Sequence, residues 1–101
     1  MDENSLLNVL YTKRANSDAV TIKNYLLYKF TQKEVDNFYE LLRIFENIVS
    51  AFPQLYPKSV TGKSLHRAVL SKQLSVFYSV SENAITVISI LDNRMDIVKW
   101  P

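Results

Sequence analysis

The chain has 101 residues, no cysteine and a formal net charge of +2, with 48% hydrophobic and 22% charged residues. This length predicts one domain, 1–101, and the composition is that of a globular protein. The lack of cysteine excludes disulfides and thiolate metal sites, and no apolar run approaches the roughly 20 residues of a membrane-spanning helix. The acidic start, MDENSLLNVLY, does not have the basic pattern of a signal peptide, so a cytoplasmic protein is expected.

The charges are unevenly distributed along the chain. No acidic residue lies between Glu46 and Glu82, whereas Lys58, Lys63, Arg67 and Lys72 do, together with the single histidine, His66. This segment carries +4, so the rest of the chain carries −2. Such asymmetry creates a local positive field that can attract an anionic partner, although a solvated basic surface explains it equally well.

The first two predicted elements are a strand and a helix. Residues 6–12 (LLNVLYT) are apolar and partly β-branched or aromatic, which favours a strand. Apolar side chains then recur every three or four positions from 15 to 30, as one face of a helix requires. Asn16, Ser17 and Asp18 are the candidate capping residues at its start.

A second helix follows without a long loop. Thr31 to Glu34 (TQKE) matches a capping box, in which the two side chains satisfy free N–H groups at a helix start. Pro53 ends this helix because proline disfavours helical geometry in the residue before it. Its expected outward side chains are those of Asp36, Glu40, Arg43 and Glu46. The expected apolar face is Val35, Phe38, Leu41, Leu42, Phe45, Ile48, Val49 and Phe52.

Three strands complete the order β-α-α-β-β-β. Residues 53–64 form a connector with two prolines and the only glycine, Gly62, which is the best candidate for a positive φ. Strands are predicted at 65–70, 74–80 and 84–91, and the polar breaks between them have hairpin length. The sequence therefore predicts an α+β fold in which a helical hairpin packs on one face of a small antiparallel sheet.

The last predicted strand is apolar on both faces. Alternation places Ile85, Val87, Ser89 and Leu91 on one face, and Thr86, Ile88 and Ile90 on the other. Two apolar faces are typical of a central strand that is covered on both sides. The helices would cover one side. The other would meet the first strand's tail, the C-terminal segment or a partner protein.

Five short runs, in order, carry a resemblance to a known family. They are Tyr11-Thr-Lys-Arg-Ala15, Ile22-x-x-Tyr25-Leu26, Phe77-Tyr78-x-Val80, Ile85-x-Val87 and Asn93-Arg94-x-Asp96. As an ordered set over about residues 9–96, they resemble the RelE/ParE superfamily, the toxins of bacterial type II toxin–antitoxin modules. The resemblance implies a helical hairpin on an antiparallel sheet and a cognate antitoxin that buries apolar surface.

The superfamily has two activities, and the residues favour one of them. RelE-like members cut mRNA on the ribosome, which needs a general base, a general acid and cations near the phosphate. The matching positions here hold His66, Ala68 and Ser75, while Arg94 matches an arginine of the cleaving members and Trp100 stands near their tyrosine. An indole N–H cannot transfer a proton at neutral pH. Most of the cleaving residues are thus missing, which favours a ParE-like toxin that inhibits a target such as DNA gyrase.

The resemblance also gives candidate site residues and partners. The expected target-binding residues are Lys63, His66, Arg67, Lys72, Arg94 and Trp100, with no metal and no cofactor. One alternative is a ribosome-dependent mRNA interferase that uses His66, Arg67 and Arg94; another is an inert member that only binds an antitoxin. A homodimer or a toxin–antitoxin hetero-oligomer is a possible assembly.

Simpler roles exist for three of these residues. His66 could be a surface histidine at a strand start, and Arg94 could pair with Asp92 or Asp96 where the last strand ends. Trp100 could be a hydrophobic plug over the sheet rather than a partner contact.

Overall fold

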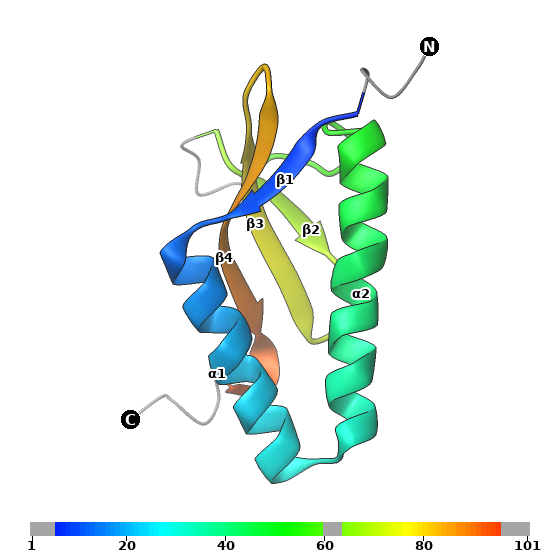
Figure 1. The fold of residues 1–101 in the computed structure, drawn as a ribbon, viewed down its shortest axis with the longest axis vertical. Helices are drawn as coiled ribbons and strands as arrows, with labels where there is room; N and C mark the ends of the chain where they lie inside the picture. Colours follow the sequence, from blue (N-terminus) through cyan, green and yellow to red (C-terminus); the bar gives the residue numbers. More distant parts are fainter. Residues whose placement is uncertain (1–5, 60–63, 96–101) are drawn as a thin grey trace.

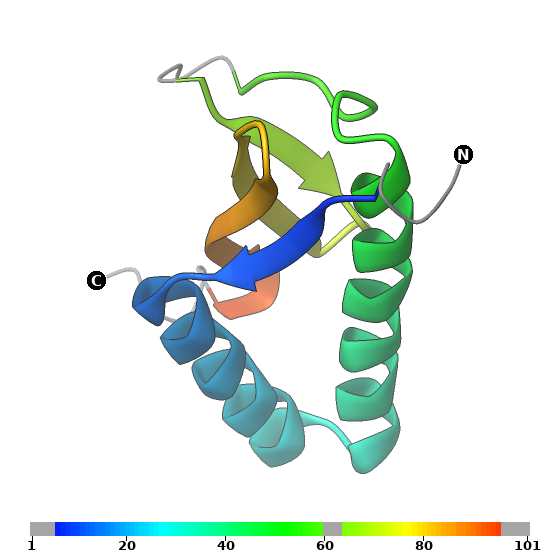
Figure 2. The ribbon, with the colours of Figure 1, turned by 45° about the horizontal axis from the view of Figure 1, so that its top comes forward.

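The computed structural model describes residues 6–59 and 64–95 (Figure 1). Its elements follow the predicted order, and the α+β fold with a helical hairpin on a four-stranded sheet is confirmed. The two helices diverge from their connection towards strand β1, as a second view shows (Figure 2). The elements are β1 (Asn8–Tyr11), α1 (Lys13–Lys29), α2 (Gln32–Ala51), β2 (His66–Val69), β3 (Leu74–Val80) and β4 (Ala84–Asp92).

Helix α1 begins at a different cap from the predicted ones. Thr12 is the N-cap, and its hydroxyl accepts a hydrogen bond from the Ala15 amide at 3.0 Å. The prediction of Asn16, Ser17 or Asp18 is therefore wrong, since all three lie inside the helix. Asp18 instead accepts a hydrogen bond from the Ile90 amide at 3.0 Å, which ties α1 to β4 beyond the end of β1.

Helix α2 has the predicted length and apolar face, but not the predicted capping box. Thr31 is the N-cap, yet its side chain makes no capping hydrogen bond. The Glu34 amide donates to the Thr31 carbonyl at 3.0 Å instead of to its hydroxyl. The Glu34 carboxylate, the other half of the box, lies 3.4 Å from Arg94. Phe52, expected on the apolar face, is the C-cap and is 64% exposed. Glu46, expected to face outward, accepts a hydrogen bond from the Tyr11 hydroxyl.

The sheet has the order β1-β4-β3-β2, and it is mixed. Strands β2, β3 and β4 form the predicted antiparallel meander, while β1 pairs in parallel with β4, from Asn8 opposite Ala84 to Tyr11 opposite Val87. Short joins force neighbouring strands to be antiparallel, whereas a long crossover permits parallel pairing. The helical hairpin follows β1 and provides such a crossover.

A bulge in β4 changes which side chains face the helices. Tyr78 lies opposite Val87, but Phe77 lies opposite Ser89, so Ile88 is an extra residue in β4. The buried positions shift accordingly, from Ile85 and Val87 before the bulge to Ile90 and Asp92 after it. The predicted division of this strand into two apolar faces is wrong beyond Ile88. The side of the sheet away from the helices is richer in serine and threonine than the sequence suggested.

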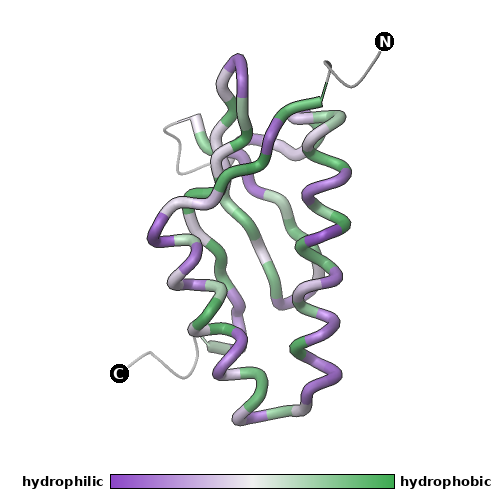
Figure 3. The backbone as a smooth tube through the Cα atoms, in the orientation of Figure 1, coloured by the Kyte–Doolittle hydropathy of each residue, from purple (hydrophilic) through white to green (hydrophobic). Residues whose placement is uncertain are grey.

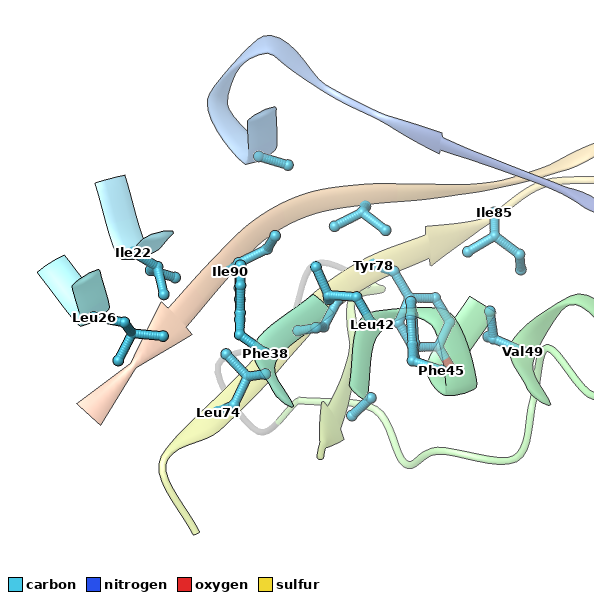
Figure 4. Packing of buried hydrophobic residues seen from close by; sticks show 14 of the residues in the cluster. Ile22, Leu26, Phe38, Leu42, Phe45, Val49, Leu74, Tyr78, Ile85 and Ile90 are labelled. Carbon is cyan, nitrogen blue, oxygen red and sulfur yellow. The ribbon is translucent and has the colours of Figure 1, made fainter. Parts of the chain in front are cut away.

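The hydrophobic core lies between the helical hairpin and the sheet (Figures 3 and 4). Its largest fully buried apolar side chains include Phe45, Leu26 and Val49 of the helices and Tyr78 and Ile85 of the sheet. The remaining members are Ala15, Ile22, Val35, Phe38, Leu42, Ala68, Leu74, Val76, Val87 and Ile90. Neither helix of the described chain has the length and apolarity needed to cross a membrane.

The connector between α2 and β2 runs along the outer edge of β2. The Arg67 amide donates to the Pro57 carbonyl at 2.9 Å, and Lys58 forms an isolated bridge with His66. Gly62, predicted to have a positive φ, lies outside the described residues. Within them, Ser64 has a φ of 63°.

Candidate functional site

The predicted site residues that the structure describes do not gather at one place. Lys63 and Trp100 lie outside the described residues. Of the other four, His66 and Arg67 are neighbours on β2 and therefore point to opposite faces of the sheet. Lys72 lies in the turn between β2 and β3, and Arg94 follows β4.

His66 is a core residue, not the surface histidine suggested as its simpler role. It is 4% exposed, and its ring stacks on that of Tyr78 with centroids 5.0 Å apart and planes 14° apart. Its Nδ1 lies 2.8 Å from the Tyr56 carbonyl oxygen. Because a carbonyl only accepts, Nδ1 carries the proton and donates it to this bond. The alternation of β2, which buries His66 and Ala68 together, was the available sequence signal for this position.

Tyr78 is the centre of the aromatic group around His66. Its side chain is fully buried, and its ring lies edge-on to those of Phe45, at 5.6 Å, and Tyr56, at 6.3 Å. Its hydroxyl donates to the Pro53 carbonyl at 3.0 Å, and burial raises the pKa of Tyr78 to about 12. The phenol is therefore protonated near neutral pH, and the aromatic group around His66 has a structural role in the core.

Arg94 is held by carboxylates of its own chain. Its Nε and Nη2 donate to the two oxygens of Asp92 at 3.1 and 2.9 Å, and its Nη1 lies 3.4 Å from Glu34. The guanidinium also lies over the Phe30 ring, 5.1 Å from its centroid. The hydrogen bond to Asp92 is the largest cause that raises the pKa of Arg94 above its ordinary value. The suggested Arg94–Asp92 pair is thus present, but Asp92 is 2% exposed and the pair is not a surface pair.

The residues after β4 join three parts of the fold. The Asn93 amide donates to the Gln73 carbonyl at 2.7 Å, and the Asn93 side chain donates to the Lys72 carbonyl at 3.1 Å. The Tyr25 hydroxyl donates to the Arg94 carbonyl at 3.4 Å. Asp92 to Arg94 thereby connects the end of β4 to the β2–β3 turn, to α1 and, through Glu34, to α2.

Arg67 is the predicted site residue whose guanidinium is most available. It is exposed on the face of the sheet away from the helices. Its Nε and Nη2 lie 3.4 and 3.3 Å from the Ser75 hydroxyl, and its Cζ lies 5.7 Å from the centre of the Phe77 ring. A hydroxyl and a ring face orient the guanidinium without neutralising it.

Sequence reasoning did not identify a groove between the two helices. Its volume is about 340 Å³. Tyr11 is one of its lining residues, and burial together with Glu46 raises the pKa of the Tyr11 phenol. Its lining comes from β1, α1 and α2 together, an arrangement that no local pattern indicates. The lining residues are Tyr11, Asn16, Ala19, Tyr39, Leu42, Arg43 and Glu46. In the described part of the chain, no three His, Cys, Asp or Glu side chains are grouped to hold a metal.

Comparisons with known proteins identify the fold. No protein-family model and no curated protein matches the chain. A chain of the chromosomal ParDE TA system from P. aeruginosa superimposes with a TM-score of 0.72 at 11% identity, covering 87% of this chain and 97% of that one. A chain of the E. coli DinJ-YafQ toxin-antitoxin complex gives 0.61 at 9% identity, with 89% and 96% covered. The conserved hypothetical protein HP0894 from Helicobacter pylori gives 0.56 at 16% identity, with 88% and 97% covered. The fold of this chain is therefore that of RelE/ParE-type toxin structures, which confirms the resemblance at the level of the fold.

Proposed function

We propose that this chain is the toxin of a type II toxin–antitoxin module and that it acts, like ParE, by binding a target such as DNA gyrase. The proposed toxin is a single domain, 1–101, in the cytoplasm, and a cognate antitoxin neutralises it. The fold shared with a chain of the ParDE TA system supports this proposal. The ParDE and DinJ-YafQ structures, each named as a two-component system or complex, also support an antitoxin as partner.

The main support for a toxin that binds its target rather than cutting RNA comes from His66 and Arg94. Both are candidate residues for RNA cleavage, and both are already bonded to groups of their own chain. His66 is buried and bonded to the Tyr56 carbonyl, and Arg94 is held by Asp92 and Glu34. Cutting RNA would require these groups to reach a substrate and exchange protons or meet a phosphate. Both would first have to leave partners that stabilise the fold. A toxin that binds its target through other residues, such as the exposed Arg67, has no such requirement.

Two assays test the proposal. The purified chain is added to DNA gyrase with relaxed and with supercoiled plasmid, and loss of supercoiling or accumulation of cleaved DNA is the expected result. In parallel, the chain is expressed alone and transcripts on ribosomes are mapped, where intact transcripts are expected. Growth arrest that is relieved by coexpression of the neighbouring reading frame would support the antitoxin.

The mRNA interferase is the second candidate, because the Arg67 guanidinium has no carboxylate partner in residues 6–59 and 64–95. Codon-bounded cuts on ribosomes would replace the gyrase proposal with this one. An unaffected gyrase, intact transcripts and normal growth would together leave an inert family member.

A further inference from the structure

We call the face of the sheet that lies away from the helices the outer face. It consists of Arg67 and Val69 of β2, Ser75, Phe77 and Ser79 of β3, and Thr86, Ser89 and Leu91 of β4. The strand register places Arg67, Phe77 and Ser89 in one row across the sheet and Val69 beside Ser75 in the next. Side chains that are paired across neighbouring strands share a face. All of these residues are at least partly exposed except Ser75, which is 2% exposed.

Arg67 differs from the other arginines in its charge environment. Arg14 pairs with Asp18, Arg43 with Glu40, and Arg94 with Asp92 and Glu34. Within residues 6–59 and 64–95, Arg67 has no carboxylate partner, and its guanidinium contacts the neutral Ser75 hydroxyl and the Phe77 ring. A guanidinium held in this way keeps donors for a planar anion that arrives from outside.

The middle of the outer face is built from small hydroxyl side chains. Ser79 and Ser89 are partly exposed, and they flank Phe77 along β3 and across to β4. Small side chains allow the backbone of another segment to approach closely, and hydroxyls can donate to it or accept from it. Val69 is 58% exposed at the edge of the same surface and offers an apolar contact.

We propose that the outer face binds an extended acidic segment of a partner protein, with a carboxylate on Arg67 and an apolar side chain against Val69. The proposal rests on the proposed function, in which the natural segment belongs to the antitoxin. One guanidinium without a carboxylate partner among the described residues suits one carboxylate better than a nucleic-acid strand, whose phosphates need a groove with several cations. The Phe77 ring is also covered by Arg67, whereas single-strand sites use open aromatic faces for base stacking.

The test uses the full chain and peptides of known sequence. Random linear dodecapeptides displayed on phage are selected on the immobilised protein, and the enriched peptides are synthesised and titrated by calorimetry. The enriched peptides are expected to contain an Asp or Glu that is required for binding. Arg67→Glu should weaken their binding at least tenfold, and replacing the peptide's carboxylate with lysine should restore binding to that variant. Arg43→Glu, on the exposed face of α2, is the matched control and should bind as the wild type does.

Further variants protect the test against misfolding. Arg67→Lys keeps the charge but loses the planar fork, so a smaller loss is expected, and Val69→Asp should weaken binding from the neighbouring row. Each variant is compared with the wild type by circular dichroism and urea unfolding before titration.

Several results would overturn the proposal. They are a selection without binders, peptides that bind Arg67→Glu unchanged, and dodecauridylate that binds through Arg67 more tightly than the peptides. Dimers of the chain that Arg67→Glu dissociates would assign the face to a second copy instead. Peptide binding through Arg67 with an unaffected gyrase would reject the proposed target and keep the docking surface. Inhibition of gyrase without any peptide binding through Arg67 would keep the target and reject the docking surface.

Discussion

Substitution of Asp92 should lower the stability of the fold by breaking one defined set of hydrogen bonds. Its carboxylate is buried, accepts both guanidinium bonds of Arg94 and also accepts from the Arg94 amide at 2.9 Å. Asp92→Asn keeps the volume but places an amide N–H₂ against guanidinium donors. We expect the free energy of unfolding to fall by about 2–3 kcal/mol, because the partly buried Arg94 guanidinium loses the nearer of its two counter-charges and keeps only Glu34, at 3.4 Å. Urea unfolding followed by circular dichroism measures this loss.

The matched control for Asp92 is an ion pair on the surface. Glu40 and Arg43 are bonded three residues apart on α2, and both side chains are well exposed. Glu40→Gln should leave the unfolding midpoint essentially unchanged, since solvent screens such a pair. Equal midpoint shifts in Glu40→Gln and Asp92→Asn would show that burial does not distinguish the two pairs.

The buried Tyr78 phenol predicts a loss of stability at alkaline pH. Burial raises its pKa from 10.0 to about 12, so above pH 10 the unfolded chain loses this proton before the folded chain does. The stabilising contribution is complete below pH 10 and is lost as the pH rises towards 12, with a slope of about 1.4 kcal/mol per pH unit. The pKa of Tyr11 is also raised, and its phenol adds to the same decline.

Tyr78→Phe separates this titration from general alkaline unfolding. At neutral pH the variant should be less stable by about 1 kcal/mol, because the Pro53 carbonyl loses its donor. Between pH 10 and 12 its free energy of unfolding should decline less steeply than that of the wild type. Urea titrations at several pH values measure both slopes, and identical slopes would refute the assignment to Tyr78.

At the scale of elements, Thr12 connects the first helix to the sheet. Its hydroxyl accepts from the Ala15 amide and donates to the Ile88 carbonyl, both at 3.0 Å. Thr12→Ala removes the N-cap of α1 and leaves the carbonyl of the bulge residue without this donor. We expect a loss of about 1–2 kcal/mol in the free energy of unfolding. Thr12→Ser retains the hydroxyl and should lose much less, and faster exchange of the Ala15 amide should accompany only the alanine variant.

Helix positions could be predicted from the sequence because their apolar spacing is local. Ala15, Ile22 and Leu26 are buried on one face of α1, as the three-to-four spacing requires. The capping residues could not be predicted in the same way. Thr12 and Asp18 both have suitable oxygens, and the path from β1 into α1 decides which of them caps.

The bulge and the parallel strand depend on contacts between distant segments. One extra residue in β4 is compatible with the alternation on either side of it, so the sequence does not mark Ile88. Nothing in residues 8–11 specifies pairing with β4, which becomes possible only after the helical hairpin returns the chain to the sheet. The same reason applies to part of the candidate site, because His66 stacks on Tyr78 of β3 and Arg94 reaches Glu34 of α2. The Arg94–Asp92 pair is local, and the sequence suggested it.

The whole molecule combines local and very distant contacts. The two helices, and the strands β2 to β4, are each joined by short connections. In contrast, β1 pairs with residues about 76 positions away, as the hydrogen bond from Thr12 to the Ile88 carbonyl illustrates. Closing so long a loop costs chain entropy before any contact compensates for it. We therefore expect the meander and its contacts with the helices to form before β1 docks.

This order predicts different kinetic effects for two valine-to-alanine variants. Val76 is fully buried in the central strand β3, while Val9 is a partly buried residue of β1. Val76→Ala should slow folding, with a φ-value near ~0.5, because its contacts belong to the early meander. Val9→Ala should chiefly speed unfolding, with a φ-value below ~0.3. Stopped-flow circular dichroism over a urea series measures both limbs, provided that each variant loses more than ~0.6 kcal/mol. If Val9→Ala slows folding as much as Val76→Ala, β1 is part of the folding nucleus, and the pairing of the chain's two ends precedes the meander rather than following it.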